Sequence, residues 1–321
     1  MTDSTLTEAD VRSVWVRLRA EVVPTTFVEP ERLSRALHMV PGLLLVSEAF
    51  QRTGSFKYRA ALAAALQSES PHLLTASSGN FGAALALAAA KTGKRCTVVM
   101  PAGSAQVKIA AVRNLGAGVD LVDTARQTRA ARVAELHRQY PEAEVISPYD
   151  DARVIAGNSS LGAELFGREL PECLVVPVGG GGLSSGLVVA RDFLARSCEV
   201  IGAEPLLAND AARSIRSGQL CVNEREPSTL CDGARTLALG KLNFALLRQG
   251  LSEIIEVEEA KIAQAVRLLF EMANLKAEPT GALSLAAVLQ APQRFAGRRV
   301  ACIISGGNVD SALYARLLVE E

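Results

Sequence analysis

The sequence predicts an α/β protein in which parallel strands are joined by crossover helices. Short β-branched runs alternate with Ala- and Leu-rich stretches of helical period, which is the pattern of such a fold. Gly93 and Gly116 stand where two of these helices are expected to end. A chain of 321 residues suggests about two domains, because one core rarely grows beyond roughly 250 to 300 residues.

Each expected strand is a short apolar or β-branched run, and most are followed by a stretch of helical period. The expected strands are Leu43–Val46, Leu73–Thr75, Thr97–Met100, Val119–Val122, Val145–Ile146, Cys173–Val178, Val200–Ala203, Ile254–Val257 and Val300–Ile304. The expected helices are Ser55–Gln67, Phe81–Lys91, Ala105–Leu115, Thr124–Gln139, Leu183–Ala195, Glu258–Met272 and Ala282–Leu289. No repeat or Pro/Gly-rich linker marks a domain boundary.

Composition excludes several classes of partner. The 34 basic and 34 acidic residues balance, so no large field favours nucleic acid or an anionic membrane. No segment approaches the roughly 18 unbroken apolar residues of a membrane helix, and the start at Met1–Thr5 lacks the features of a signal peptide. We therefore expect a soluble, cytoplasmic protein with a small neutral or zwitterionic ligand.

The cysteines are expected to be buried free thiols. They are scattered, several stand in apolar runs, and none forms a Cys-x-x-Cys pair. They are Cys96, Cys173, Cys198, Cys221, Cys231 and Cys302.

Four consecutive glycines, Gly179–Gly182, follow the apolar run Leu174–Val178 and precede a helix at Leu183. Glycines let the main chain approach an anion closely, and the helix N-terminus adds partial positive charge. This stretch therefore predicts a phosphate site. The alternative is a turn needed only for tight packing between strand and helix.

Neither common nucleotide fingerprint matches this stretch well. A Walker loop needs Gly-Lys-Ser/Thr, whereas Gly186 is followed by Leu187. A Rossmann fingerprint needs a third Gly or Ala where Ser185 stands. Glu204, at the end of the next expected strand, is placed where a ribose-binding acid would lie, so a nicotinamide-dependent dehydrogenase stays an alternative.

Lys57 differs in context from the other six lysines, which lie where a solvated charge is ordinary. It follows Gly54, which permits a sharp entry into a helix, and Thr53 and Ser55 are candidate caps. The helix dipole disfavours a positive charge in the first turn. Lys57 therefore either reaches solvent or has its amine neutralised, as a Schiff base would do.

Four segments, taken in order, resemble the serine/threonine dehydratase and serine racemase family. They are Thr53-Gly54-Ser55-Phe56-Lys57, Ser77-Ser78-Gly79-Asn80, Gly179–Leu183 and Ser305-Gly306-Gly307-Asn308. Further likeness is found at Pro148-Tyr149-Asp150-Asp151, Ala156-Gly157, Asp232-Gly233 and Glu278-Pro279-Thr280, so the resemblance runs from about Pro24 to Asn308. The family consists of pyridoxal-phosphate enzymes of fold type II, similar to the tryptophan synthase β subunit.

The resemblance implies two open, parallel-rich sheets flanked by helices. Residues 1–78 and 151–321 would form a large domain that binds the cofactor. Residues 79–150 would form a small mobile domain that closes over the substrate and excludes water. Members of the family commonly form homodimers, so a homodimer is expected here.

The resemblance also assigns the cofactor site. Lys57 would hold pyridoxal 5'-phosphate as a Schiff base and later remove the α-proton of the substrate. Phe56 would flank the ring, and Asn80 would donate to its phenolic oxygen. Ser305 would face the pyridine nitrogen with a neutral hydroxyl, which favours loss of a β-leaving group over transamination. The cofactor phosphate would lie on Gly179, Gly180, Gly181, Gly182 and Leu183.

The substrate carboxylate would bind the backbone at a helix N-terminus, where amide donors lack intrahelical partners. This segment consists of Ser77, Ser78, Gly79, Asn80 and Phe81. Ser78 would act on the opposite face of the substrate from Lys57, which makes racemisation an alternative reaction. A simple helix cap is the other reading of Ser78.

The implied reaction is dehydration of L-serine or L-threonine to a 2-keto acid and ammonia. A racemase and a ligand-binding relative without activity stay as alternatives. Three departures from the family pattern leave the substrate open: Phe81 replaces a common histidine, Ala60 a glycine, and Asn158-Ser159-Ser160 a frequent Gln-Gly-Thr. A 3-hydroxyaspartate dehydratase, with Arg129 or Arg153 binding the second carboxylate, is one candidate. Bulkier 3-hydroxy and 2,4-diamino acids are others.

A metal site is implied at Glu204, Ala208 and Asp210, which match the positions where family members bind Mg²⁺ or Ca²⁺ through two carboxylates and a backbone carbonyl. Its expected role is to stabilise the fold. Two solvated acids are the alternative. Because the sequence ends at Glu321, no regulatory domain and no feedback control by isoleucine are expected.

Overall fold

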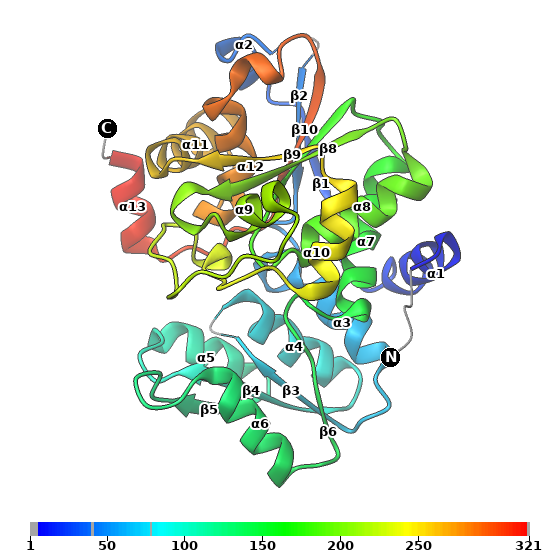
Figure 1. The fold of residues 1–321 in the computed structure, drawn as a ribbon, viewed down its shortest axis with the longest axis vertical. Helices are drawn as coiled ribbons and strands as arrows, with labels where there is room; N and C mark the ends of the chain where they lie inside the picture. Colours follow the sequence, from blue (N-terminus) through cyan, green and yellow to red (C-terminus); the bar gives the residue numbers. More distant parts are fainter. Residues whose placement is uncertain (1–5, 40–41, 78, 320–321) are drawn as a thin grey trace.

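The computed structural model describes residues 6–39, 42–77 and 79–319, and it contains two sheets (Figure 1). The larger sheet has six strands in the order β1-β2-β10-β7-β8-β9, and the smaller sheet has four in the order β5-β4-β3-β6. Every pairing is parallel except that of β1 with β2. The predicted α/β class, with two parallel-rich sheets flanked by helices, is confirmed.

The strands are β1 Thr26–Val28, β2 Gly42–Ser47, β3 His72–Ala76, β4 Arg95–Pro101, β5 Gly118–Val122, β6 Ala143–Val145, β7 Cys173–Pro177, β8 Glu199–Pro205, β9 Glu253–Val257 and β10 Arg299–Ile304. All the strands expected from the sequence are present. The sequence did not indicate β1, because three residues are too few to show a period.

The helices are α1 Glu8–Leu18, α2 Glu31–Ala36, α3 Lys57–Gln67, α4 Asn80–Lys91, α5 Gln106–Asn114, α6 Arg129–Gln139, α7 Ala152–Phe166, α8 Gly182–Leu194, α9 Asp210–Ser217, α10 Lys241–Gly250, α11 Glu259–Ala273, α12 Pro279–Gln290 and α13 Ser311–Val319. The expected start of α6 at Thr124 is wrong. Thr128 caps this helix by accepting from the backbone N–H of Ala131 at 3.1 Å.

The six-stranded sheet is covered on both faces, with α11 and α12 on one side and α7 and α8 on the other (Figure 1). Successive residues of one strand serve the two cores. Val175 of β7 packs with the α11 and α12 side, while Leu174 and Val176 pack with the α7 and α8 side. Burial on both faces explains why these strands are continuous apolar runs.

The four-stranded sheet lies below the larger one in Figure 1. Helices α3 and α4 share a core with it, and α6 packs through Val133 and Leu136 against Leu74 and Val99. This sheet already includes β3, which precedes the predicted boundary at residue 79. The division into a large and a small mobile domain stays a proposal.

Five of the six free cysteines are buried, as expected, whereas Cys221 is partly exposed and departs from the prediction of buried thiols. Among the described helices, none combines the length and apolar character that crossing a membrane demands.

Candidate active site

A cavity of about 1450 Å³ lies where β3, β7 and β10 end, and residues from both sheets line it. Its walls include every predicted cofactor and substrate residue that the structure describes: Phe56, Lys57, Ser77, Gly79, Asn80, Phe81, Gly179, Gly180, Gly181, Gly182, Leu183 and Ser305. Ser78 lies outside the described residues. The carboxyl ends of parallel strands thus bring together segments that are far apart in the sequence.

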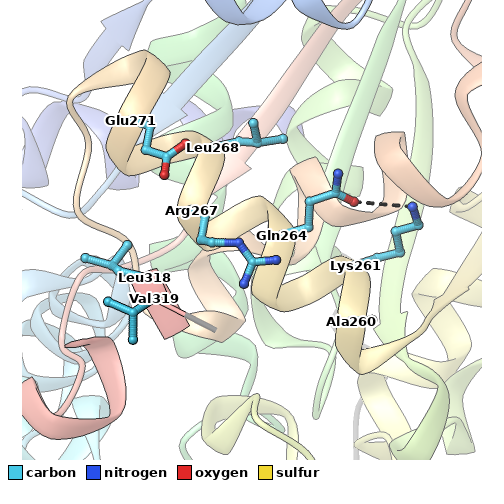
Figure 2. Close-up of a pocket in the computed structure, with 8 residues that line it drawn as sticks. All are labelled: Ala260, Lys261, Gln264, Arg267, Leu268, Glu271, Leu318 and Val319. Carbon is cyan, nitrogen blue, oxygen red and sulfur yellow. Dashed lines mark hydrogen bonds between the residues drawn. The ribbon is translucent and has the colours of Figure 1, made fainter. Parts of the chain in front are cut away.

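A second hollow, of about 580 Å³, lies between α11 and α13 and contains none of these residues (Figure 2). Polar and apolar side chains line it in equal number, and Lys261 donates to Gln264 along the helix at 3.2 Å. The larger cavity is therefore the candidate active site.

Lys57 is the first residue of α3, and its side chain enters the large cavity. Its Nζ donates to the backbone oxygen of Pro148 at 2.8 Å and lies 5.0 Å from the ring centre of Phe56 and 5.6 Å from that of Phe81. Burial lowers the pKa of Lys57 to about 8, and the negative charge of Glu278 partly offsets this effect. The reading of Lys57 as a solvated charge is wrong.

The predicted caps of α3 are also wrong. The residue before the helix is Phe56, with no side-chain cap, and Thr53 has a left-handed backbone with φ of 62°. The hydroxyls of Thr53 and Ser55 are buried without a hydrogen-bond partner among the described residues. The turn before Lys57 is therefore held by its backbone rather than by a serine or threonine cap.

The glycine stretch forms a tight turn into α8. Gly181 precedes the helix with φ of 93°, which glycine adopts readily. A Cβ at Gly180 would lie 2.4 Å from the ring of Tyr149, so a larger residue does not fit there. Asn243 of α10 donates to the oxygens of Gly180 at 2.8 Å and Tyr149 at 3.0 Å. This cradle of backbone at a helix N-terminus fits a phosphate.

Ser305 and the Lys57 segment are joined by the backbone. Phe56 donates to the oxygen of Ser305 at 3.0 Å, and Ser55 pairs with Gly306 in an isolated bridge. Lys57 and Ser305, which are both predicted to contact the cofactor ring, thus lie on chain segments that are hydrogen-bonded to each other.

Glu278 is a buried acid in this cavity whose role the sequence did not indicate. Its Oε1 accepts from Nδ2 of Asn80 at 2.8 Å. The pKa of Glu278 is raised to about 8, mainly by burial and to a smaller extent by the nearby charge of Asp232. Only the motif around Pro279 hinted at the importance of this segment.

The hydroxyl of Ser77 holds the start of α4, whereas the alternative reading of Ser78 as a cap lies outside the described residues. Its Oγ accepts from the backbone N–H of Gly82 at 3.1 Å and of Gly79 at 3.3 Å. Helix α4 then begins at Asn80, and Phe81 is buried against its neighbours. The amides at this helix start suit a carboxylate.

Of the two arginines predicted for a second carboxylate, only Arg129 lines the cavity. It lies 3.6 Å from Glu226. Arg153 instead pairs with Asp151 at 2.8 Å and with Glu144 at 2.5 Å. The structure therefore excludes Arg153 from the role.

Two further residues line the cavity that the sequence did not single out. The Oγ1 of Thr236 is buried without a partner among the described residues. Lys108 of α5 pairs with Asp232 at 3.0 Å across the two sheets. No local motif surrounds either residue, so only the folded chain identifies them.

The proposed metal residues lie outside the cavity and close together. Glu204 accepts from the backbone N–H groups of Ala211 at 2.9 Å and Ala212 at 2.8 Å, at the start of α9. Asp210 accepts from Asn223 at 2.8 Å, and its Oδ2 has no partner among the described residues. Both acids are only 1% exposed, so the reading of two solvated acids is wrong.

Burial raises the pKa values of both acids, that of Asp210 to about 6, and the charge of Asp210 contributes to the rise at Glu204. An unpartnered buried carboxylate oxygen fits a hard cation. Three or more acidic, histidine or cysteine side chains do not gather around a point anywhere in the described chain. Ala208 could add only its carbonyl. Glu204 does not line the cavity, which removes the basis for the dehydrogenase alternative.

Comparisons with known proteins agree with this geometry. The family model for pyridoxal-phosphate dependent enzymes matches residues 18–306. An L-threo-3-hydroxyaspartate ammonia-lyase from Pseudomonas sp is 36% identical over 90% of this chain and 92% of its own length. A serine racemase from Schizosaccharomyces pombe is 35% identical over 84% of this chain and 85% of its own.

A solved structure of a threonine deaminase from T.th. superposes with a TM-score of 0.90 at 37% identity, covering 95% of this chain and 99% of that one. The resemblance inferred from the motifs is confirmed, as is fold type II. The protein belongs to the family of pyridoxal-phosphate dependent enzymes that includes serine racemases and threonine and hydroxyaspartate ammonia-lyases.

Proposed function

We propose that this protein is an ammonia-lyase that removes water from a β-hydroxy-α-amino acid and releases a 2-keto acid and ammonia. The observation that carries the proposal is the position of Lys57. Its amine, with a pKa lowered to about 8, lies in one cavity with the glycine turn and the start of α4. An amine that loses its proton near neutral pH suits both attachment to a carbonyl and proton removal.

The residues proposed to hold the cofactor all line the cavity, and their roles are those that the family resemblance implies. Lys57 would attach pyridoxal 5'-phosphate, and the turn Gly179–Leu183 would bind its phosphate. Ser305 would face the pyridine nitrogen, Phe56 would flank the ring, and Asn80 would donate to the phenolic oxygen. When bound, the cofactor supplies the electron sink that makes the α-hydrogen of an amino acid acidic.

The neutral hydroxyl of Ser305 supports elimination. Without a carboxylate to keep the pyridine nitrogen protonated, the electron sink is weaker, which favours prompt loss of the β-hydroxyl. Racemisation remains the alternative, since it needs a second acid or base such as Ser78 on the opposite face of the substrate. Chiral analysis of recovered substrate separates the two reactions.

Among substrates, we propose 3-hydroxyaspartate ahead of L-serine and L-threonine. Arg129 supports this choice because its guanidinium lines the cavity and a planar fork matches a second carboxylate. The Pseudomonas relative that acts on 3-hydroxyaspartate by name supports it too. Serine and threonine lack that carboxylate, so with either substrate Arg129 would keep its ion pair with Glu226.

The test is a keto-acid assay of the cofactor-loaded protein with L-threo-3-hydroxyaspartate, L-serine, L-threonine and their D-isomers. The proposal predicts keto acid and ammonia in equal amounts, with the largest kcat/KM for 3-hydroxyaspartate. Recovery of racemised substrate without keto acid would replace the lyase by a racemase.

Three further properties are proposed from the sequence and its resemblance. A Mg²⁺ or Ca²⁺ ion at Glu204, Ala208 and Asp210 would stabilise the fold near α9. Residues 79–150 would close over the substrate. The protein would act in the cytoplasm as a homodimer.

A further inference from the structure

Asn308, four residues after the end of β10, connects two segments of the candidate active site. Its Nδ2 donates to the backbone oxygen of Thr53 at 2.6 Å and to Oδ1 of Asn80 at 2.8 Å. The turn at Thr53 and Gly54 packs closely against this amide. Both residues have left-handed backbones, with φ of 62° and 74°, and a Cβ at Gly54 would lie 2.2 Å from Oδ1 of Asn308.

The partners of this amide fix which way it points. A backbone oxygen only accepts hydrogen bonds, so the nitrogen of Asn308 must face Thr53. Its second N–H is directed at Asn80, whose oxygen therefore faces Asn308. The nitrogen of Asn80 then points the other way, toward Oε1 of Glu278 at 2.8 Å. One hydrogen of that nitrogen stays available to the cavity.

We infer that Asn308 is a positioning residue that holds the carboxamide of Asn80 with its nitrogen toward the cofactor. This inference rests on the proposed contact between Asn80 and the phenolic oxygen of the cofactor. A flipped amide would present an oxygen to that phenolic oxygen and replace an attraction by a repulsion. Asn308, whose nitrogen must face the oxygen of Thr53, can only donate to Asn80 and so excludes the flipped form.

The hydrogen bonds that join Asn80 to Asn308 and Glu278 connect two sides of the cavity. Asn80 begins α4, which packs with the four-stranded sheet, whereas Asn308 and Glu278 flank strands and helices of the six-stranded one. The amide of Asn80 therefore takes its orientation from the opposite side of the cavity.

The decisive variant is Asn308→Asp in the cofactor-loaded protein. Aspartate has the shape of asparagine but donates no hydrogen bond, so it repels the oxygen of Thr53 and attracts the nitrogen of Asn80. We expect Asn80 to flip, the visible absorption of the bound cofactor to shift, and kcat to fall about tenfold, as the loss of one hydrogen bond to a charged oxygen predicts. Asn114→Asp, which adds the same charge to the cavity wall on α5, should leave the spectrum unchanged.

Asn80→Ala separates failure of this inference from failure of the proposed site. If Asn80→Ala leaves the absorption unchanged, Asn80 does not contact the cofactor and the site proposal itself is wrong at this residue. If Asn80→Ala shifts the absorption and Asn308→Asp does not, the inference about Asn308 is overturned. Asn308→Ala, which lacks the added charge, provides the same comparison should Asn308→Asp fold poorly.

A double variant completes the test. In the Asn80→Ala background, Asn308→Asp should change neither the spectrum nor kcat further, because the residue it positions is gone. Equal effects of Asn308→Asp in both backgrounds would mean that Asn308 acts by another route, and would also overturn the inference.

Discussion

The two walls of the cavity are built differently. On the wall that would bind the cofactor, Gly179–Gly182, Lys57 and Ser305 are fixed by backbone hydrogen bonds and by contacts too tight for a Cβ. On the opposite wall, Lys108 and Arg129 reach across through ion pairs between partly exposed side chains. Such pairs contribute little to stability and are easily exchanged for other partners.

The difference between the walls matches the different needs of a cofactor and a substrate. A cofactor that stays bound needs a fixed site, and close-packed backbone supplies one at the cost of tolerating no larger side chain. A substrate that enters and leaves needs contacts that open, and exposed ion pairs supply them. The two walls should therefore respond differently to substitution.

The largest effect is expected at Gly180, on the cofactor wall. In Gly180→Ala the new methyl group would meet the ring of Tyr149 at 2.4 Å, and overpacking of this kind costs about 1–3 kcal/mol. Affinity for pyridoxal 5'-phosphate, measured by titration of the cofactor-free protein, should fall about a hundredfold. Gly103→Ala, where a Cβ meets no atom within 4 Å among the described residues, is the control. Equal affinity of both variants would show that the cofactor wall is not tightly fixed.

The substrate wall should give a smaller and selective effect. Arg129→Gln removes the charged partner of a second carboxylate, which costs about 1.5–3 kcal/mol for a hydrogen bond to a charged group. The kcat/KM for 3-hydroxyaspartate should fall at least tenfold, while that for L-serine changes by less than about threefold. Arg126→Gln, whose side chain is 88% exposed, is the control on the same side. A uniform loss for all substrates would contradict the role of Arg129 as a carboxylate site.

The pH dependence of cofactor attachment tests the environment of Lys57. Its pKa in the folded protein is about 8, below the ordinary 10.5, and only the neutral amine attacks a carbonyl. The rate of attachment to the cofactor-free protein should therefore rise with pH up to about 8 and then level off. A rate that keeps rising toward pH 10 would mean that the amine is not desolvated.

The smallest effect is expected away from both walls, at Asp210. If a divalent cation binds there, millimolar Mg²⁺ or Ca²⁺ should raise the Tm by a few degrees relative to a chelator, because binding to the folded state alone stabilises it. Asp210→Asn should abolish that rise, and the exposed Asp123→Asn should not. No rise with either ion in the parent protein would exclude the metal site.

The same contrast explains what the sequence could predict. The turn at Gly179–Gly182 and the segment around Lys57 are local motifs, and the ends of parallel strands bring such motifs together. The contacts of Asn308 with Thr53 and Asn80 join segments far apart in the chain, so no local pattern announces them. Arg129 and Arg153 could not be told apart from the sequence, because only the folded chain places one of them in the cavity and pairs the other with Asp151 and Glu144.

The sequence did not indicate α1, α2, α7, α9, α10 or α13. The longest of these, α7, was missed because its middle, Gly157–Ser160, consists of weak helix formers that tertiary packing overrides. A Cβ at Gly157 would lie 2.6 Å from the backbone oxygen of Arg59, so the glycine permits close contact of α7 with α3. The prediction of Thr53 and Ser55 as caps before Lys57 was wrong because contacts with a distant segment, rather than the helix, set the conformation there. Thr53 has a left-handed backbone, and its oxygen accepts a hydrogen bond from Asn308.

The attachment of the cofactor to Lys57 can be read from the visible absorption spectrum of the purified protein. The spectrum is recorded with added pyridoxal 5'-phosphate, before and after 3-hydroxyaspartate, L-serine or L-threonine. Lys57→Ala is the comparison, and Lys276→Ala, a second lysine on the cavity wall, is its control. We expect a yellow band that survives gel filtration in the parent and in Lys276→Ala, disappears in Lys57→Ala, and changes as keto acid forms. A band that persists in Lys57→Ala, or its absence from the parent protein, would contradict the assignment of Lys57 as the residue that binds the cofactor.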